Sequence, residues 1–464
     1  MKNVAQVILE KIDAKSGNEV AYVDTSNRHW TYGEFKIEIN QYRHLIQASQ
    51  LSTEQVICLA PLGFQLIALL IACFAEGKTV IFIDPKLGLK NFFKLITDLK
   101  NTSVIYHKQH VFTFVLRMFF RNLEFIKLGH AKKTIEINTN QFKENNPRLM
   151  DGFTSGTTGT MKRIQREHAH MIASSALFNK HIVKLNPDRH LVGYTLSVVR
   201  NLIDQGTAFE ISKKNKYICT YIENYQITRL SGPPILLYKA ICSYEKMNMV
   251  NTTIKNIVIG GAPAQYWLIQ KAKIIFPNAI IQNIYGCTEC EPIAISNDQQ
   301  MLSCTQHGYF VGNLVDGLIS ELRPLDENLF ELFLQGPQVT KSEGHLTGDL
   351  VRKSKNDNGL ILVGRKSYLL KNDDSKLYGQ YEIESFIERN DLAVKKAAVL
   401  QNNNRLYIFI EYFVSHEKNN DNLKSEITKN FSFNDIQIKN IQKFPYDSRH
   451  QWKVQYQELR KYIK

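Results

Sequence analysis

The chain has 464 residues, of which 44% are hydrophobic and 22% charged, and its formal net charge is +14. This length exceeds one ordinary core and predicts two or three domains, while the composition excludes a disordered or fibrous chain. The positive balance favours anionic partners such as nucleotides or a membrane surface, although dispersed, solvated lysines explain it equally well. The basic residues are not interleaved with aromatic residues on a recognisable module, so we expect no nucleic-acid partner.

The sequence shows no sign of a membrane span or of export. Its longest apolar run, at 66–75, is about half of what a bilayer needs and predicts a buried helix. The N-terminal stretch "MKNVAQVILEKIDAKSG" carries acidic residues and has no small-residue cleavage site, so we expect no signal peptide. Seven cysteines, an odd number scattered over a long chain, fit a reducing compartment. We therefore expect a cytoplasmic protein without a transmembrane segment.

One segment leaves peripheral membrane contact open. The stretch "VFTFVLRMFFRNLEF", at 111–125, is both aromatic and basic. It fits an amphipathic helix on a membrane surface, but aromatic residues at helical spacing fit a buried core equally well.

The first half of the chain reads as α/β. A β-branched segment begins at Val56, an apolar helical stretch ends near Gly77, and a second strand closes at Pro85. This is a βαβ unit, which predicts a parallel sheet covered by helices. Similar strands are expected to begin at Ser103, Thr207, Asn256 and Ala279. Each ends at a glycine, a polar turn or a charged loop, where α/β folds bind ligands.

The pattern changes after Leu318 to short alternating segments, which predict antiparallel strands. Beyond Gly364 the sequence predicts a helix at 380–390, strands at 395–401 and 405–413, and a basic tail. We therefore expect an α/β fold with a large multi-subdomain N-terminal domain, residues 1–363, and a small α+β C-terminal domain, residues 364–464.

The stretch "FTSGTTGTMKRI", from Phe153, is rich in hydroxyls and glycine. Such a loop exposes backbone N–H groups with little bulk, so a phosphate chain can lie against it, and one lysine at its end adds a point charge. The candidate phosphate ligands are Thr154, Ser155, Gly156, Thr157, Thr158, Gly159 and Lys162. The P-loop pattern is not met, because Thr160 and Met161 separate the last glycine from the lysine.

Further motifs follow in order over nearly the whole chain. They are "GGAPA" from Gly260, "YGCTE" from Tyr285, "LTGDL" from Leu346, "GRKSYLLK" from Gly364 and "KVQYQELR" from Lys453. Together with the loop at Thr154, this set resembles the adenylate-forming superfamily, which includes acyl-CoA synthetases, luciferases and peptide-synthetase adenylation domains. Five ordered motifs at plausible spacings are far more specific than any one of them.

The resemblance implies a role for each matching residue. The loop from Thr154 to Lys162 would hold the β and γ phosphates of ATP, and Lys453 would reach the α-phosphate and the carboxylate. Thr288 would contact the α-phosphate and Glu289 would bind Mg²⁺, a hard cation that prefers oxygen ligands. Adenine would lie against Gly260, Gly261, Ala262, Tyr285 and Gly286, and the ribose against Asp349 and Arg365.

The resemblance also implies an activity. ATP would activate a carboxylic acid as acyl-AMP, and the small domain would then rotate about a hinge at Ser367 so that CoA accepts the acyl group. A fatty acid is the expected substrate, because no acidic residue near "GYTLSVVRN" is available for an amino group and "LSGPPILLY", from Leu230, is apolar. Aryl acids stay open.

The chain departs from the family pattern at several points. Met161 and Arg163 replace the proline and glycine around the loop lysine, Trp452 replaces the glycine before Lys453, and "NDD" from Asn372 replaces a glycine pair near the pantetheine path. Two alternatives therefore remain: transfer of the acyl group to the phosphopantetheine of an acidic carrier protein, and a non-catalytic homologue that binds nucleotide or acyl ligand.

A zinc site competes for one of these motifs. Cys287, Cys290, Cys304 and His307 have the C-x2-C…C-x2-H spacing of a structural zinc site. Zinc on Cys287 and Cys290 would place Thr288 and Glu289 in a metal knuckle, away from ATP. The adenylation motifs support one another, so we expect no zinc quartet. We also assign His168, at a predicted helix start, a structural role.

Overall fold

The computed structural model describes most of the chain, which forms two compact units, Met1–Leu230 and Ser231–Lys464. The residues outside the description are 1, 61–62, 84–88, 98, 100, 107–116, 119, 121–122, 128–141, 144–145, 156–160, 194–197, 200–205, 211–216, 356–357, 414–419, 448–450 and 464. Most of the basic aromatic stretch at 111–125 and of the loop after Ser155 therefore lies outside the described residues.

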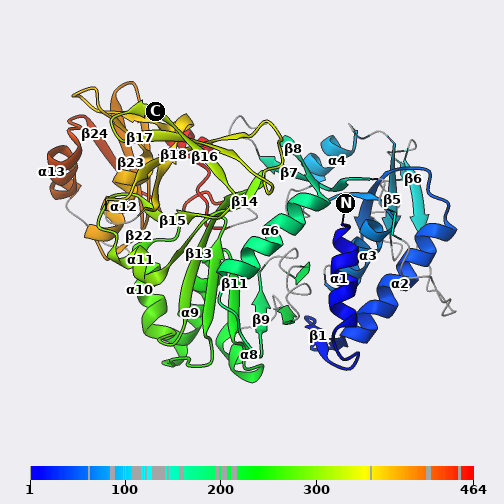
Figure 1. The fold of residues 1–464 in the computed structure, drawn as a ribbon. Coiled ribbons are helices and arrows are strands. Elements are labelled where there is room, and N and C mark those ends of the chain that lie inside the picture. Colours follow the sequence, from blue (N-terminus) through cyan, green and yellow to red (C-terminus); the bar gives the residue numbers. More distant parts are fainter. Residues whose placement is uncertain are drawn as a thin grey trace. The chain divides into compact units, whose positions relative to one another are not determined.

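The first unit contains a six-stranded sheet in the order β6-β5-β3-β4-β7-β8 (Figure 1). Its strands are β3 (Gln55–Leu59), β4 (Thr79–Ile81), β5 (Thr102–Tyr106), β6 (Glu124–Lys127), β7 (Arg148–Ser155) and β8 (Met161–Glu167). β3 pairs in parallel with both β4 and β5, and α3 (Phe64–Ala75) connects β3 to β4. The predicted βαβ unit is confirmed.

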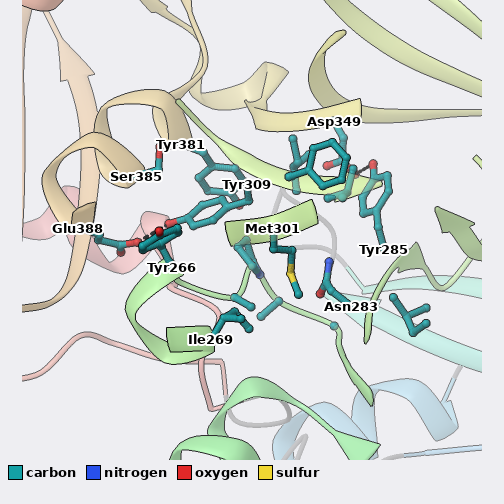
Figure 2. Close-up of a pocket in the computed structure, with 18 of the residues that line it drawn as sticks. Tyr266, Ile269, Asn283, Tyr285, Met301, Tyr309, Asp349, Tyr381, Ser385 and Glu388 are labelled. Carbon is teal, nitrogen blue, oxygen red and sulfur yellow. Dashed lines mark hydrogen bonds between the residues drawn. The ribbon is translucent and has the colours of Figure 1, made fainter. Parts of the chain in front are cut away.

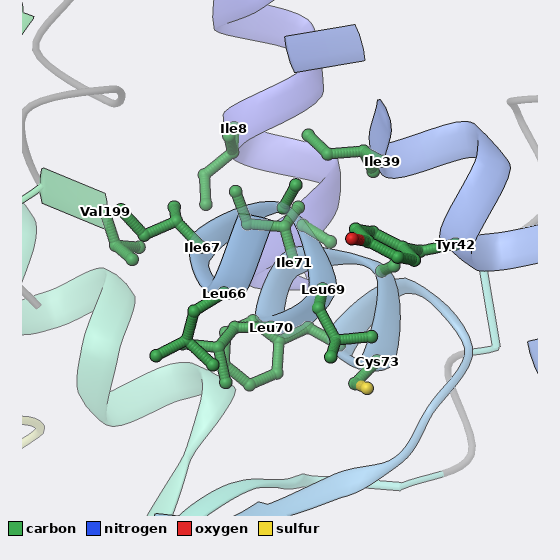
Figure 3. Packing of buried hydrophobic residues seen from close by; sticks show 14 of the residues in the cluster. Ile8, Ile39, Tyr42, Leu66, Ile67, Leu69, Leu70, Ile71, Cys73 and Val199 are labelled. Carbon is green, nitrogen blue, oxygen red and sulfur yellow. The ribbon is translucent and has the colours of Figure 1, made fainter. Parts of the chain in front are cut away.

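The apolar run at 66–75 forms a buried helix. Every residue of α3 except Gln65 is buried, because the helix packs against α1 (Val4–Asp13) and α2 (Tyr32–Ala48). Figure 3 shows Ile8 from α1 and Ile39 and Tyr42 from α2 around this helix. Within the described residues, no helix is both long and apolar enough to cross a bilayer.

A second group of strands in this unit follows the order β9-β10-β1-β2. They are β1 (Val20–Val23), β2 (His29–Thr31), β9 (Arg189–Val192) and β10 (Thr207–Glu210). β9, β10 and β1 run parallel, and β2 is antiparallel to β1. The remaining helices of the unit are α4 (Leu89–Thr97), α6 (His168–His181) and α8 (Ile218–Asn224).

In the second unit a parallel region meets an antiparallel one. β11 (Arg229–Gly232), β12 (Asn256–Gly260) and β13 (Ile280–Cys287) are neighbours, and β12 and β13 run parallel. From β13 onward the neighbours are antiparallel. They are β14 (Cys290–Asn297), β15 (Tyr309–Leu314), β16 (Ile319–Asp326), β17 (Leu329–Gln335), β18 (His345–Lys353) and β19 (Leu360–Arg365), with helices α9 (Pro234–Met247), α10 (Tyr266–Ile275) and α11 (Asp298–Ser303). The expected antiparallel segments after Leu318 are confirmed.

The C-terminal part of this unit has its own three-stranded sheet, β22-β23-β24. Its elements are β22 (Val394–Asn402), β23 (Arg405–Tyr412), β24 (Ile436–Asn440), α12 (Gln380–Asn390), α13 (Asn420–Phe431), the hairpin β20 (Leu370–Lys371) and β21 (Leu377–Tyr378), and α14 (Tyr456–Leu459), with short 3-10 turns η2 (Lys366–Tyr368) and η3 (Arg460–Tyr462). The helix expected at 380–390 and both strands after it are confirmed. The boundary at Gly364 stays a prediction, as does the hinge at Ser367, an exposed residue within η2.

Candidate nucleotide site

One pocket of the second unit gathers residues from several of the predicted motifs (Figure 2). Gly261 and Ala262 line it after β12, Tyr285 and Gly286 line it at the end of β13, and Lys453 reaches it from the C-terminal segment. Asp349 of β18 and Arg365 of β19 complete this set. The structure therefore brings together motif residues that lie up to about 190 residues apart in the sequence.

Asp349 is held by two neighbours at once. Its Oδ2 accepts a hydrogen bond of 2.7 Å from Tyr285 Oη, and its Oδ1 lies 2.9 Å from Arg365 Nε. Asp349 and Arg365 stand opposite each other in the β18–β19 ladder, so the backbone pairing itself sets the ion pair. Each carboxylate oxygen has a second lone pair, and the guanidinium has further N–H donors. The pair can thus bind two neighbouring hydroxyls, as a ribose presents.

The electrostatics agree with this geometry. The Asp349 carboxylate raises the pKa of the Arg365 guanidinium further above its ordinary value, so the arginine stays charged. Burial, followed by the Asp349 charge, raises the pKa of Tyr285 well above its ordinary value, so this phenol remains a hydrogen-bond donor.

Glycines shape two points near the pocket. A Cβ on Gly260 would stand 2.9 Å from the carbonyl oxygen of Ile284, its partner in the β12–β13 ladder. Gly348 has φ +71°, which side chains rarely adopt, and lets the chain turn between Thr347 and Asp349. The Thr347 hydroxyl donates to the Leu332 carbonyl at 2.9 Å and accepts from the Asp349 N–H at 3.0 Å. The Thr-Gly-Asp motif therefore fixes the direction of the carboxylate.

Thr288 and Glu289 form the two-residue turn between β13 and β14. The backbone N–H of Thr340 donates to the Glu289 carbonyl at 2.8 Å, which ties the turn to the segment before β18. The half-exposed Glu289 carboxylate suits Mg²⁺, which is usually held by one or two carboxylates together with substrate phosphates. Glu289 would hold this ion, which would offset phosphate charge. However, Cys287 and His345 also face this carboxylate, and thiol and imidazole are softer ligands than Mg²⁺ prefers.

Lys453 lies in a short, well-fixed segment. The Lys453 carbonyl accepts a hydrogen bond of 2.8 Å from the Asp447 N–H, and Val454 pairs with Tyr446. The lysine side chain is exposed to the water in the pocket, but the pocket walls keep it away from bulk solvent. This loss of bulk hydration, followed by the Arg365 charge, lowers the pKa of Lys453. Lys453 and Arg365 are both cations, so an anionic group of a ligand would bind most favourably beside them.

Trp452 is fixed in the protein interior. The residue is 2% exposed, and its ring stacks on Tyr446 with an interplanar angle of 11°. It also lies 5.4 Å from Tyr238 and 6.2 Å from Trp267, measured between ring centroids. The residue that replaces the family glycine is therefore an anchor for the segment that carries Lys453.

In the first unit, the predicted phosphate loop connects β7 to β8. Residues 156–160, including Gly156, Thr157, Thr158 and Gly159, lie outside the described residues, and of Thr154 and Ser155 only the backbone is described. Lys162 pairs with Thr154 across the hairpin, and its side chain is exposed. The roles of these residues stay predictions.

Arg163, which replaces a glycine of the family pattern, is held by the sheet. Successive side chains of a strand point to opposite faces, so Arg163 points away from the side of Lys162. Its guanidinium pairs with the buried Asp151 and donates to Gln55 Oε1 at 2.7 Å. Arg163 therefore neutralises a buried carboxylate of the sheet.

The zinc quartet does not form. Cys290 packs in a buried apolar cluster, and the His307 ring lies against Phe386 and Phe431, with centroids 5.3 and 5.4 Å away. Within the described part of the chain, Cys287 shares its possible metal site with Glu289 and His345 instead. All seven cysteines are among the described residues, and none of them forms a disulfide.

His168 is structural, as expected. It is 4% exposed, and its Nδ1 accepts a hydrogen bond of 3.1 Å from the Val4 N–H. Burial lowers the pKa of His168 to about 4, so the ring is neutral at ordinary pH.

Sequence reasoning missed the far wall of the pocket, seen beside Tyr309 in Figure 2. Tyr381, Ser385 and Glu388 of α12 line this wall, and Glu388 Oε2 accepts a 2.7 Å hydrogen bond from Tyr309 Oη. These residues lie on a helix whose pattern predicted only packing, so no motif could have revealed them.

The fold defines an α/β protein, and its pocket brings a carboxylate–guanidinium pair together with a lysine. The chain belongs to the AMP-binding enzyme family, whose model matches residues 9–342, within the adenylate-forming superfamily. Its fold is that of this superfamily, with a large N-terminal α/β domain and a small C-terminal α+β domain.

Similar proteins include ligases of several kinds. The 4-coumarate–CoA ligase-like 9 protein of Arabidopsis thaliana is 26% identical over 289 residues, which cover 53% of this chain and 49% of that protein. The chain thus spans about half the length of this relative. The amide bond synthetase McbA of Marinactinospora thermotolerans superposes with a TM-score of 0.84 at 15% identity, covering 99% of both chains.

The o-succinylbenzoate CoA synthetase MenE of Bacillus subtilis, solved with its acyl-adenylate intermediate, superposes with a TM-score of 0.79 at 15% identity, covering 98% of this chain and 97% of that one. The same synthetase has also been solved with ATP and a magnesium ion.

Proposed function

We propose that the protein is an ATP-dependent ligase that activates a carboxylic acid as acyl-AMP and transfers the acyl group to CoA. Membership of the AMP-binding family supports the first step, and the CoA ligases among similar proteins support the second. The observation that carries the proposal is the placement of Lys453 in one pocket with Asp349 and Arg365. A ribose-binding pair and a nearby cation are what an acyl-adenylate needs.

In the proposed first step, the acid's carboxylate oxygen bonds to the α-phosphorus of ATP, and the bond to pyrophosphate breaks. Asp349 and Arg365 orient the ribose, Tyr285 lies against adenine, and Lys453 stabilises charge on the α-phosphate and the entering carboxylate. Thr288 would contact the α-phosphate, and Glu289 would hold Mg²⁺, which would offset phosphate charge. A role of Lys162 and the loop before it toward the outer phosphates stays a prediction from the sequence. In the proposed second step, the CoA thiol attacks the acyl carbon and AMP leaves.

We propose a fatty acid as the substrate, since the stretch from Leu230 is apolar. Leu230 and Leu237 are buried, which is compatible with an apolar chain nearby. We also propose a cytoplasmic location, because seven cysteines scattered along the chain without a disulfide fit a reducing compartment. Contact with a membrane surface through residues 111–125 stays a proposal.

A carrier-protein acceptor is the second candidate, and the loop after β20 favours it. Asn372 Nδ2 donates to the Phe431 carbonyl at 2.8 Å, and Asp373 Oδ2 accepts a 2.9 Å hydrogen bond from the Asn434 N–H. Side chains thus fix a loop that is expected to lie beside the pantetheine path. The +14 charge also suits an acidic carrier protein.

Pyrophosphate release over a panel of fatty and aryl acids, with ATP and Mg²⁺, tests the first step. Adding CoA or a phosphopantetheine-loaded carrier protein then identifies the acceptor. Lys453→Ala should slow adenylate formation by about 100-fold or more, while thioester formation from added acyl-AMP stays within about threefold. Lys461→Ala, at an exposed lysine of the same tail, is the matched control. If no acid in the panel gives pyrophosphate release, the protein is better explained as a non-catalytic homologue.

A further inference from the structure

Three side chains beside the pocket form an unassigned set of metal ligands. The Cys287 Sγ, a carboxylate oxygen of Glu289 and an imidazole nitrogen of His345 lie within 4.8 Å of one another. We propose that these three side chains bind a zinc-like divalent cation. The proposed site shares Glu289 with the expected magnesium position but recruits two ligands that magnesium does not use.

The backbone explains why residues so far apart in sequence meet here. Cys287 ends β13 and Glu289 lies in the two-residue turn that follows, while His345 begins β18. The Thr340 N–H donates to the Glu289 carbonyl, and Val339 pairs with Cys290. The segment before β18 therefore runs beside the turn and delivers His345 to it.

The spacing is close to what zinc requires. Tetrahedral zinc, with ligands at about 2.0 to 2.3 Å, places its ligand atoms about 3.3 to 3.6 Å apart. Because no two of these atoms are more than 4.8 Å apart, each pair would close by at most about 1.5 Å. His345 is buried, with 8% exposure, whereas Cys287 and Glu289 are half-exposed, so these two side chains have more room to rotate toward the imidazole. Three protein ligands leave a fourth position for water or an anionic ligand.

The chemistry of the donors selects the ion. One thiolate, one imidazole and one carboxylate suit zinc and its neighbours in the first transition row, while Mg²⁺ prefers oxygen alone. Binding replaces the S–H bond of Cys287 by an S–metal bond, and the proton goes to water. Burial, followed by the charge of Glu289, raises the pKa of the Cys287 thiol, so the proton leaves only when a cation takes its place.

The site has a functional consequence that rests on the proposed function. A zinc ion would engage the Glu289 carboxylate, which the adenylation step needs for magnesium. Zinc should therefore inhibit adenylate formation in competition with Mg²⁺, and His345 should be required for that inhibition.

Cobalt(II) titration of the metal-free full chain, without ATP or acid, tests the site by itself. We expect one Co²⁺ per chain, with the charge-transfer absorption of a thiolate ligand, and displacement by Zn²⁺. Cys287→Ser should abolish the thiolate band. Loss of an outer-shell partner weakens metal binding by about 10- to 100-fold. His345→Gln removes a direct ligand and should weaken Co²⁺ binding by more than this.

Two variants serve as controls. Cys242→Ser changes a half-buried cysteine of α9, and Cys304→Ser removes a member of the alternative quartet. Both should bind Co²⁺ as the unmodified chain does. No thiolate band, or equal loss of binding in Cys304→Ser and Cys287→Ser, would overturn the proposal.

Inhibition is measured separately, as the zinc concentration that halves pyrophosphate release relative to each variant's own zinc-free rate. This concentration should rise in His345→Gln. Because the cobalt titration needs no turnover, failure of the metal site and failure of the proposed ligase activity are distinguishable.

Discussion

The indole nitrogen of Trp452 donates a hydrogen bond of 2.7 Å to Oε1 of Gln265, a residue 187 positions earlier in the chain. Gln265 is fully buried and directly precedes α10. The residue next to Lys453 is thus tied to the start of a helix in the region expected to form the large domain. The position of the lysine depends on this bond as well as on its own contacts.

Trp452→Phe keeps an aromatic ring but removes the N–H donor and leaves Gln265 Oε1 unpaired. The loss of about 1 kcal/mol that a neutral hydrogen bond contributes predicts adenylate formation about fivefold slower, measured by ATP–pyrophosphate exchange. Trp452→Gly, which also removes the ring, should slow it further. Trp30→Phe is the matched control, because the Trp30 indole donates to Asp24 at 2.9 Å in the first unit. Equal slowing in both Phe variants would contradict the positioning role.

The rate of adenylate formation should fall at alkaline pH. Since loss of bulk hydration, followed by the Arg365 charge, lowers the pKa of Lys453, the ammonium loses its proton below the pH at which an ordinary lysine does. The charge that stabilises phosphate oxygens is therefore present at low pH and lost as pH rises. Lys453→Arg should shift this alkaline limb upward, because a guanidinium stays protonated. A limb at the same pH in both proteins would show that another group titrates.

Asp349→Asn removes the charge that faces Arg365 and one acceptor for the ribose. Loss of a charge-assisted hydrogen bond of about 1.5 to 3 kcal/mol predicts a KM for ATP about 10- to 100-fold higher. The KM for the acid should change by less than about threefold. Glu321→Gln, which breaks an exposed pair with Arg323, is the control. Equal effects on both KM values would argue against a ribose contact.

His168 predicts acid sensitivity of the first unit. The unfolded chain binds a proton at this histidine near pH 6.5, whereas burial keeps the pKa of the folded ring at about 4. The unfolded state thus binds more protons, and stability present above pH 6.5 is lost as pH falls toward 4, by up to about 3 kcal/mol. His168→Gln should flatten this part of the stability curve in urea unfolding, while His29→Gln, at an exposed histidine, should not.

Much of the secondary structure could be predicted from local patterns. The βαβ unit from Val56 and the helix at 380–390 are clear because a strand and a helix impose different apolar periods. The apolar alternation of β18 is weaker, because Gly348 and the polar residues of the site interrupt the first half of this strand.

Residues of the site could be predicted from the sequence only where they belong to a motif. Asp349 and Arg365 belong to recognisable strings, and their contact follows from strand register. The role of Trp452 depends on packing against Tyr238 and Trp267, which no local pattern contains. The meeting of Cys287 with His345 likewise depends on two hairpins that tertiary structure aligns.

The register that sets Asp349 opposite Arg365 also limits how the protein can change. Inserting one residue into β18 ahead of Asp349 would turn its side chain to the other face of the sheet and separate it from Arg365 and Tyr285 together. We therefore expect Asp349, Arg365 and Tyr285 to be retained together when the sequence changes. Loops at the ends of the strands carry no such constraint, so descendants of this chain can acquire new acids or acceptors while the ribose-binding pair stays the same.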